Sequence, residues 1–136
     1  KVRSGPLPLV GRKKAGVYSY PDIVDICGEP QYLDPHSDVI LNPKAIVEVL
    51  SDSTEGFDRG IKFTRFQQFN PTLADYVLIC QNWPQMEHFH RHDDGSWTYV
   101  NLIGMEAGVH LDAINCRLTA VEVYRRVELS GSIDDF

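Results

Sequence analysis

Short apolar runs, separated by polar stretches rich in glycine and proline, follow one another along this chain and predict a strand-rich protein. The first run covers residues 22–27 and has a proline near each end. The second, at 44–50, is almost entirely apolar, which is typical of a strand covered on both faces of a sheet. A third apolar run lies at 75–80. We therefore predict three strands in the first 80 residues.

Helical spacing is found between the second and third predicted strands. Residues 51–54 (SDST) offer several N-caps, and the helical pattern continues to Phe69. Asn70-Pro71 then ends it, because proline cannot continue a helix. This pattern predicts one helix of about 14 residues.

The C-terminal half is predicted to be mostly strands. Segments 85–92 and 96–102 flank Asp93-Asp94-Gly95, a sequence typical of a hairpin turn. Apolar positions from Val109 onward predict a last strand pair and a short terminal helix that ends near Glu128.

Composition places the chain among ordinary globular proteins. It has 136 residues, of which 43% are apolar and 24% charged. No apolar run approaches the roughly 18 residues that span a bilayer, and the first 14 residues do not read as a secretory signal. We therefore expect no membrane association and a cytoplasmic location.

Charge is distributed unevenly along the sequence. The net charge is −6, yet five of the 13 basic residues lie in the first 14 positions, where no acid occurs. We therefore expect a basic N-terminal arm at 1–21 and a single domain at 22–136. Such an arm either contacts nucleic-acid phosphates or is a solvated segment, and the sequence leaves both interpretations open.

Glu48 breaks the usual rules of burial. It stands between Val47 and Val49 in the most apolar stretch of the chain, where an ionised carboxylate costs several kcal/mol unless it is paired. Strand alternation puts it on the same face as Ile46 and Leu50. If the preceding strand pairs with this one, Asp22 and Glu48 converge and can share a divalent cation.

Lys62 is the candidate partner of these acids. At 100° per residue, it falls in the same arc of the predicted helix as Phe66 and Phe69, so its ammonium is directed toward the sheet. The alternative is an exposed pair with Asp58 at i,i+4, worth about 0.3–0.5 kcal/mol. Spacing alone leaves both interpretations open.

Three histidines alternate along the predicted hairpin. His88, His90 and His92 would lie on one strand face, about 6.5–7 Å apart along the strand. That spacing is too wide for all three to bind one ion at about 2.0–2.1 Å. We therefore predict a solvated hairpin face rather than a zinc site.

Four ordered motifs carry a resemblance to a known family. The strings at 20–24 (YPDIV), 45–54 (AIVEVLSDST), 58–63 (DRGIKF) and 75–79 (DYVLI) resemble the Uma-type restriction endonucleases, a bacterial branch of the PD-(D/E)xK nuclease superfamily. This resemblance implies an α/β fold with a restriction-endonuclease-like core, in which a mixed central β-sheet is flanked by helices. Members of the family carry a helix and a strand before the PD strand, and we expect this region to be absent here.

The resemblance also implies roles for individual residues. Asp22 matches the Asp of the PD motif and Glu48 the acid of (D/E)xK, so both would bind the metal together with the backbone carbonyl of Val49. Leu50 stands where the motif has its lysine, and in this branch the role passes to the following helix, where Lys62 is the matching residue. The supporting candidates are Asp58, as a partner of Lys62, and Gln68. No residue is assigned to an organic cofactor.

The expected function is therefore a metal-dependent endonuclease that hydrolyses DNA phosphodiester bonds with Mg²⁺ or Mn²⁺. Two alternatives stay open. One is a catalytically silent nuclease-fold protein that acts as a binding or regulatory module. The other is a structural dimer whose sheet edge is completed by a second chain, and a homo-oligomer is expected in either case.

Overall fold

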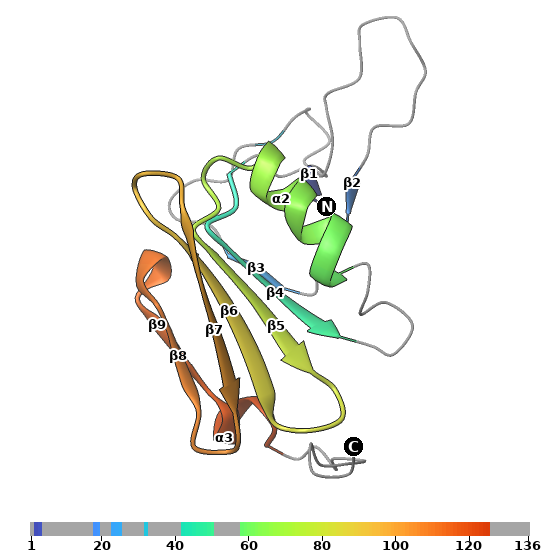
Figure 1. Cartoon of the computed structure of the whole chain (residues 1–136), viewed down its shortest axis with the longest axis vertical. Coiled ribbons are helices and arrows are strands. Elements are labelled where there is room, and N and C mark those ends of the chain that lie inside the picture. The colour runs from blue at the N-terminus through green and yellow to red at the C-terminus, as the bar shows by residue number, and fades with distance from the viewer. Residues whose placement is uncertain are drawn as a thin grey trace, which may run out of the picture.

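The computed structural model describes residues 2–3, 18–19, 23–25, 32, 42–50 and 58–125. The largest element within these ranges is a five-stranded sheet (Figure 1). In order across the sheet, its strands are β3 (Ile23–Asp25), β4 (Ala45–Leu50), β5 (Asp75–Cys80), β6 (Gln85–Arg91) and β7 (Trp97–Ile103).

The sheet is mixed, and its register determines which side chains share a face. Strands β4 and β5 run parallel with Glu48 beside Leu78, whereas the other neighbouring strands are antiparallel. Ile23 of β3 lies opposite Val47 of β4. The sequence predicted a mixed sheet with helices, and that fold class is confirmed.

A helix covers one face of the sheet and a hairpin covers the other. On one face, the π-helical turn η1 (Asp58–Lys62) continues into α2 (Phe63–Phe69). On the other lie β8 (Gly108–Leu111), the short 3-10 helix η2 (Asp112–Ile114), β9 (Cys116–Thr119) and α3 (Ala120–Val123). A separate antiparallel pair is formed by β1 (Val2–Arg3) and β2 (Tyr18–Ser19).

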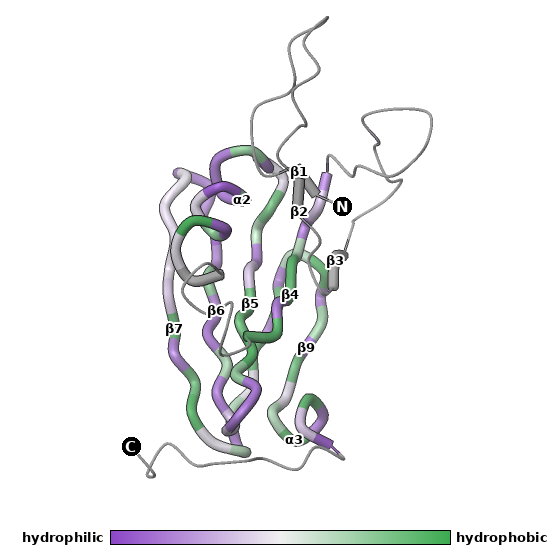
Figure 2. Tube along the Cα trace, turned by 90° about the vertical axis from the view of Figure 1, so that its right-hand side faces the viewer, coloured by the Kyte–Doolittle hydropathy of each residue, from purple (hydrophilic) through white to green (hydrophobic). Residues whose placement is uncertain are grey.

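Alternation along the strands divides the apolar core in two, and hydrophobic and hydrophilic segments alternate along the strands in Figure 2. The helix-side core contains Ile46, Leu50, Phe66, Leu73, Tyr76 and Leu78. The hairpin-side core contains Ala45, Val47, Val77, Ile79, Met86, Val109, Leu111, Ala120 and Tyr124. Glu48 belongs to the same face as Ile46 and Leu50, as the strand pattern predicted.

Aromatic contacts hold α2 against the sheet. The ring of Phe63 lies 4.8 Å from that of Tyr76 and 4.4 Å from that of Phe89, centroid to centroid. Phe66, one turn further along, is fully buried. The helix ends at Phe69, and the backbone N–H and side-chain amide of the following residue, Asn70, both donate to the Phe66 carbonyl at 3.1 Å. The rotation of the helix about its axis is therefore fixed by packing.

Most predicted elements are found with small shifts. The third predicted strand is confirmed, and so is the predicted end of the helix at Phe69. The described part of that helix begins with a π-helical turn. Gly95 closes the predicted hairpin turn with φ of +86°, a conformation that glycine adopts without strain. The last strand pair is present, and the helix after it ends at Val123 rather than near residue 128. Within the described ranges no helix is long and apolar enough to cross a membrane.

Candidate active site

A buried ion pair joins the sheet to the helix that covers it. The Nζ of Lys62 lies 2.9 Å from Oε1 of Glu48, and the two side chains are 11% and 3% exposed. Glu48 comes from the interior of β4, and Lys62 is the last residue of η1. The structure therefore brings together Glu48 and Lys62, which the sequence analysis proposed as partners.

Local folding explains why Lys62 points inward. Its Nζ lies 5.9 Å from the centre of the Phe66 ring, so the lysine shares the buried stripe of the helix. Ile61, the preceding residue, is 56% exposed and lies on the outer side. The inward direction expected from the helical arc is what the structure has. The alternative, in which Lys62 forms a solvent-exposed ion pair with Asp58, does not fit, because Lys62 is buried.

Electrostatics make this pair sensitive to the loss of either member. A buried pair contributes little net stability, because removing two charges from water offsets most of their attraction. Removing one partner, in contrast, leaves a buried charge uncompensated and costs about 3–5 kcal/mol. Packing alone would be served as well by two apolar side chains, so the pair is a candidate for a chemical role.

The other predicted site residues are placed less completely. Asp22 lies outside the described residues. The first residue of β3, Ile23, lies opposite Val47, which is the residue before Glu48. Asp58 begins η1, but its side chain is outside the described part. Val49 is described within β4, and its side chain is 43% exposed. Their roles remain predictions.

Gln68 lies on the exposed side of α2. Together with Thr64, Gln67 and Arg91 it lines a surface groove of about 530 Å³. It follows Lys62 by six positions, which corresponds to a rotation of about 240° around the helix axis. The structure therefore does not bring Gln68 to the buried pair, and a supporting role for it also remains a prediction.

A second buried carboxylate occupies the same face of the sheet. Glu87 of β6 is 2% exposed, and Leu78 of β5 stands between it and Glu48 in the register. The hydroxyl of Tyr99, on β7, donates to Oε1 of Glu87 at 2.5 Å. Glu87 is not among the residues predicted from the sequence. Its position in the strand was the available signal, because alternation puts Glu87 on the sheet face opposite to that of Met86 and His88.

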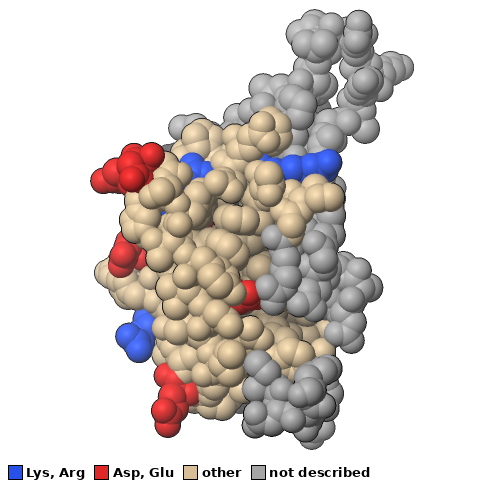
Figure 3. Space-filling model, in the orientation of Figure 1, with Lys and Arg blue, Asp and Glu red and all other residues tan. Residues whose placement is uncertain are grey.

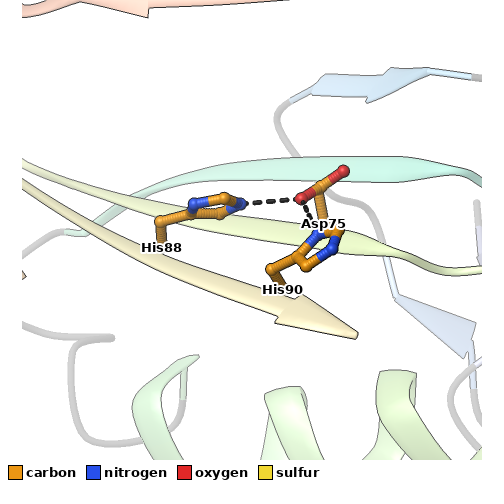
Figure 4. Close-up of side chains that lie close together, drawn as sticks. All are labelled: Asp75, His88 and His90. Carbon is orange, nitrogen blue, oxygen red and sulfur yellow. Dashed lines mark hydrogen bonds and ion pairs between the residues drawn. The ribbon is translucent and has the colours of Figure 1, made fainter. Parts of the chain in front are cut away.

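On the opposite face, two of the three histidines converge on an acid (Figure 4). Nε2 of His88 and Nδ1 of His90 donate to Oδ1 of Asp75 at 2.7 and 2.8 Å. Asp75 is fully buried, and the histidine side chains are 13% and 28% exposed. The prediction of a solvated hairpin face is therefore wrong for these two, because the neighbouring strand places a buried carboxylate between them. His92 lies beyond β6 and is exposed, as predicted.

Burial and hydrogen bonding act in opposite directions on this acid. Burial raises the pKa of Asp75, but hydrogen bonds from His88 and His90 and their electrostatic attraction together bring it below its ordinary 3.8. Asp75 is therefore held as a carboxylate that accepts from both rings. Sequence spacing within one strand did not reveal this cluster, since Asp75 belongs to the adjacent strand.

Comparison with known proteins agrees with this architecture. The family model described as "Putative restriction endonuclease" (Uma2) matches residues 10–122. An uncharacterized protein of Synechocystis, sll1609, is 38% identical over 92 residues, which are 68% of this chain and 51% of that protein. A second one, slr1290, is 34% identical over 112 residues, 79% of this chain and 55% of that protein. The chain thus spans about half the length of the curated relatives it matches. It belongs to the Uma2 family of restriction-endonuclease-like proteins, within the PD-(D/E)xK group.

Proposed function

We propose that this protein is a metal-dependent endonuclease that hydrolyses DNA phosphodiester bonds. The observation that supports this most directly is the buried pair of Glu48 and Lys62, with Nζ and Oε1 2.9 Å apart. Family membership supports the same class of reaction, because the family model carries the description "Putative restriction endonuclease". A cytoplasmic location, where bacterial DNA lies, goes with this proposal.

The reaction sets clear chemical requirements. A phosphodiester is a poor electrophile because its negative oxygens repel the attacking water. The site must neutralise that charge, orient the water and stabilise the charge that develops in the transition state. Two carboxylates and one ammonium meet these requirements, and one member of each kind lies in the described pair.

The donor set fits a hard divalent cation. Carboxylate and carbonyl oxygens are the ligands that Mg²⁺ and Mn²⁺ take in proteins, and Glu48 supplies such oxygens at a buried position. Asp22, the residue before Ile23, would supply the second carboxylate, and Val49 a backbone carbonyl. When bound, the cation would polarise the scissile phosphate and lower the pKa of a coordinated water.

Lys62 would act on the substrate side of this arrangement. An ammonium held by the helix beside Glu48 can orient the attacking water and offset the negative charge that builds on the phosphate oxygens. Its contact with the Phe66 ring limits the directions in which it can move. Asp58, four residues earlier, would tune its position.

DNA is the proposed partner. In Figure 3, basic side chains appear across the upper part of the helix-bearing face, at the level of α2, and acidic ones lie mainly along the left margin. The first 14 residues add five basic side chains and no acid. Basic groups of this kind bind phosphates, so binding is expected to weaken as salt increases.

One observation favours a non-enzymatic alternative. Strand β7 is the last strand of the described sheet, and it exposes Tyr99, Val100 and Ile103. Exposed apolar groups on an edge strand are typical of a surface that pairs with another chain. A structural dimer would use this edge and would need no active site.

The test is cleavage of supercoiled plasmid by the full chain with Mg²⁺ or Mn²⁺. We expect metal-dependent nicking that Glu48→Gln and Lys62→Met each reduce by at least about 100-fold. The matched controls are Glu106→Gln, at an exposed turn position, and Lys44→Met, just before β4; both should cleave like the parent.

A double variant separates chemistry from folding. Glu48→Gln with Lys62→Met removes both charges, so it should recover much of the stability that either single change loses while remaining inactive. Activity in that double variant would contradict the proposal. Salt-sensitive DNA binding without nicking by the parent would favour the binding module, and a stable dimer on gel filtration with neither property would favour the structural dimer.

A further inference from the structure

The cluster of Asp75, His88 and His90 has the composition and spacing of a metal site, and it is separate from the proposed active site. One ligand atom from each of the three residues lies within 4.8 Å of the other two. The register places Asp75 on the same sheet face as Ala45 and Val77, whereas Glu48 lies on the opposite face with Ile46 and Leu50.

We propose that these three side chains bind one divalent transition-metal ion of the zinc class. Two imidazoles and one carboxylate are the ligands of many zinc sites that keep a further position open, and imidazole nitrogen favours zinc over magnesium. The ion would join β5 to β6, since Asp75 comes from one strand and both histidines from the other.

The side chains would have to shift modestly to take an ion, since their three ligand atoms now lie within 4.8 Å of one another. The nitrogens of His88 and His90 already point at the same carboxylate oxygen, at 2.7 and 2.8 Å. In a tetrahedral zinc site, adjacent ligand atoms are about 3.3 Å apart, so each contact would widen by about half an ångström. The ion would replace the two hydrogen-bonding protons, and each neutral ring would carry its proton on the other nitrogen.

A second observation comes from the carboxylate itself. The other oxygen of Asp75, Oδ2, is buried and has no hydrogen-bond partner in the part of the chain that the structure describes. Leaving such an oxygen unpaired is unfavourable, and more so when the group is charged. The two histidine hydrogen bonds both go to Oδ1. A bound cation would compensate the negative charge that the carboxylate shares with Oδ2. His90, with its side chain 28% exposed, marks the side from which an ion can enter.

The chain contains two matched controls. His110 also has an acid two residues away, Asp112, at 2.5 Å, but both are exposed and no second histidine is part of that pair. His92 follows on the same side of the hairpin, where its Nε2 contacts the hydroxyl of Thr98. Neither has the three-ligand arrangement.

The experiment is a zinc titration of the chelator-treated 136-residue chain, followed by calorimetry, with nitrogen NMR of the imidazoles as a second measurement. We expect one equivalent of Zn²⁺ to bind, about 100-fold excess Mg²⁺ not to displace it, and the ring nitrogens of two histidines to change. His90→Gln and Asp75→Asn should each weaken binding at least about tenfold, and His110→Gln and His92→Gln should bind like the parent.

The variant at the more exposed position, His90→Gln, separates a loss of zinc binding from misfolding. Asp75→Asn alters a buried group, whereas His90→Gln changes a partly exposed one, so loss of binding by a folded His90→Gln variant suffices as support. Glu48→Gln should still bind zinc, which keeps this result independent of the proposed nuclease activity. Absence of zinc binding by the parent at micromolar protein, or equal binding by His90→Gln, would overturn the proposal.

Discussion

The buried carboxylates on the two faces of the sheet have different kinds of partner. On the helix side, Glu48 is paired with a lysine from another layer, at 2.9 Å. On the hairpin side, Asp75 receives hydrogen bonds from two histidines of the neighbouring strand. The first arrangement depends on how the helix packs on the sheet, and the second depends only on strand register.

This difference bears on how each cluster responds to change. An ammonium donates hydrogen bonds and accepts none, so Lys62 can serve Glu48 only as a donor. Imidazole can donate, accept or bind a metal, so the Asp75 cluster can exchange protons for a metal ion. We therefore expect a rigid, charge-dependent role on the helix side and a ligand-dependent one on the hairpin side.

The largest stability effect is expected from breaking the pair on the helix side. Lys62→Met should lower the free energy of unfolding by about 3–5 kcal/mol, because Glu48 is then left buried and uncompensated. Urea denaturation followed by circular dichroism measures this. Lys44→Met, at a less buried position, should change it by less than about 0.5 kcal/mol. Equal effects of the two substitutions would show that Lys62 is not compensating a buried charge.

A smaller effect is expected from the aromatic contacts that hold the helix. Phe63→Leu removes ring contacts with Tyr76, Phe89 and Trp97, and each such pair is worth about 0.5–1.5 kcal/mol beyond simple burial. The free energy of unfolding should fall by about 1–3 kcal/mol. Plasmid nicking should fall with it, since Lys62 immediately precedes Phe63 in the chain. Ile61→Ala, on the exposed side, is the comparison and should leave both measurements nearly unchanged.

The smallest effect is expected on the hairpin side, and it depends on pH. Burial raises the pKa of Tyr124 above 10.0, and its hydroxyl donates to the Cys80 carbonyl at 2.6 Å. Because the folded state disfavours the phenolate, this contribution to stability is full below pH 10.0 and is lost as the pH rises through the raised pKa.

Tyr124→Phe should therefore cost about 1 kcal/mol at neutral pH and make the decline in stability above pH 10 shallower. Thermal denaturation at a series of pH values tests both statements. Tyr32→Phe, at a position that is 41% exposed, should alter neither. A parallel decline for parent and Tyr124→Phe variant would show that another group causes the alkaline loss.

Much of the fold was predictable because local rules and packing agree. The apolar runs at 44–50 and 75–80 became β4 and β5, and the helix pattern ended at Phe69 as Asn70-Pro71 indicated. Glu48 and Lys62 were identifiable because each breaks a burial rule on its own element. A charged residue in an apolar pattern needs an oppositely charged partner, and in the structure Glu48 and Lys62 are partners of each other.

The hairpin-side cluster was not predictable in the same way. His88 and His90 were visible as a strand pattern, but their partner lies 13 and 15 residues earlier, on a strand whose register the sequence does not reveal. Asp75 resembled an ordinary polar residue at a strand start. The π-helical turn was also missed, because a helical pattern does not distinguish one hydrogen-bonding period from another over five residues.

Leu50 occupies the position two residues after Glu48, and it is packed in the helix-side core. Since the amine comes from η1 instead, the separation between acid and amine depends on the distance between two layers rather than on the fixed rise along a strand. A substitution that thickens or thins the contact between helix and sheet would thus change the reach of the amine without touching either group. In this protein, the interlayer contacts of Phe63 and Phe66 therefore also help to set the distance between Lys62 and Glu48.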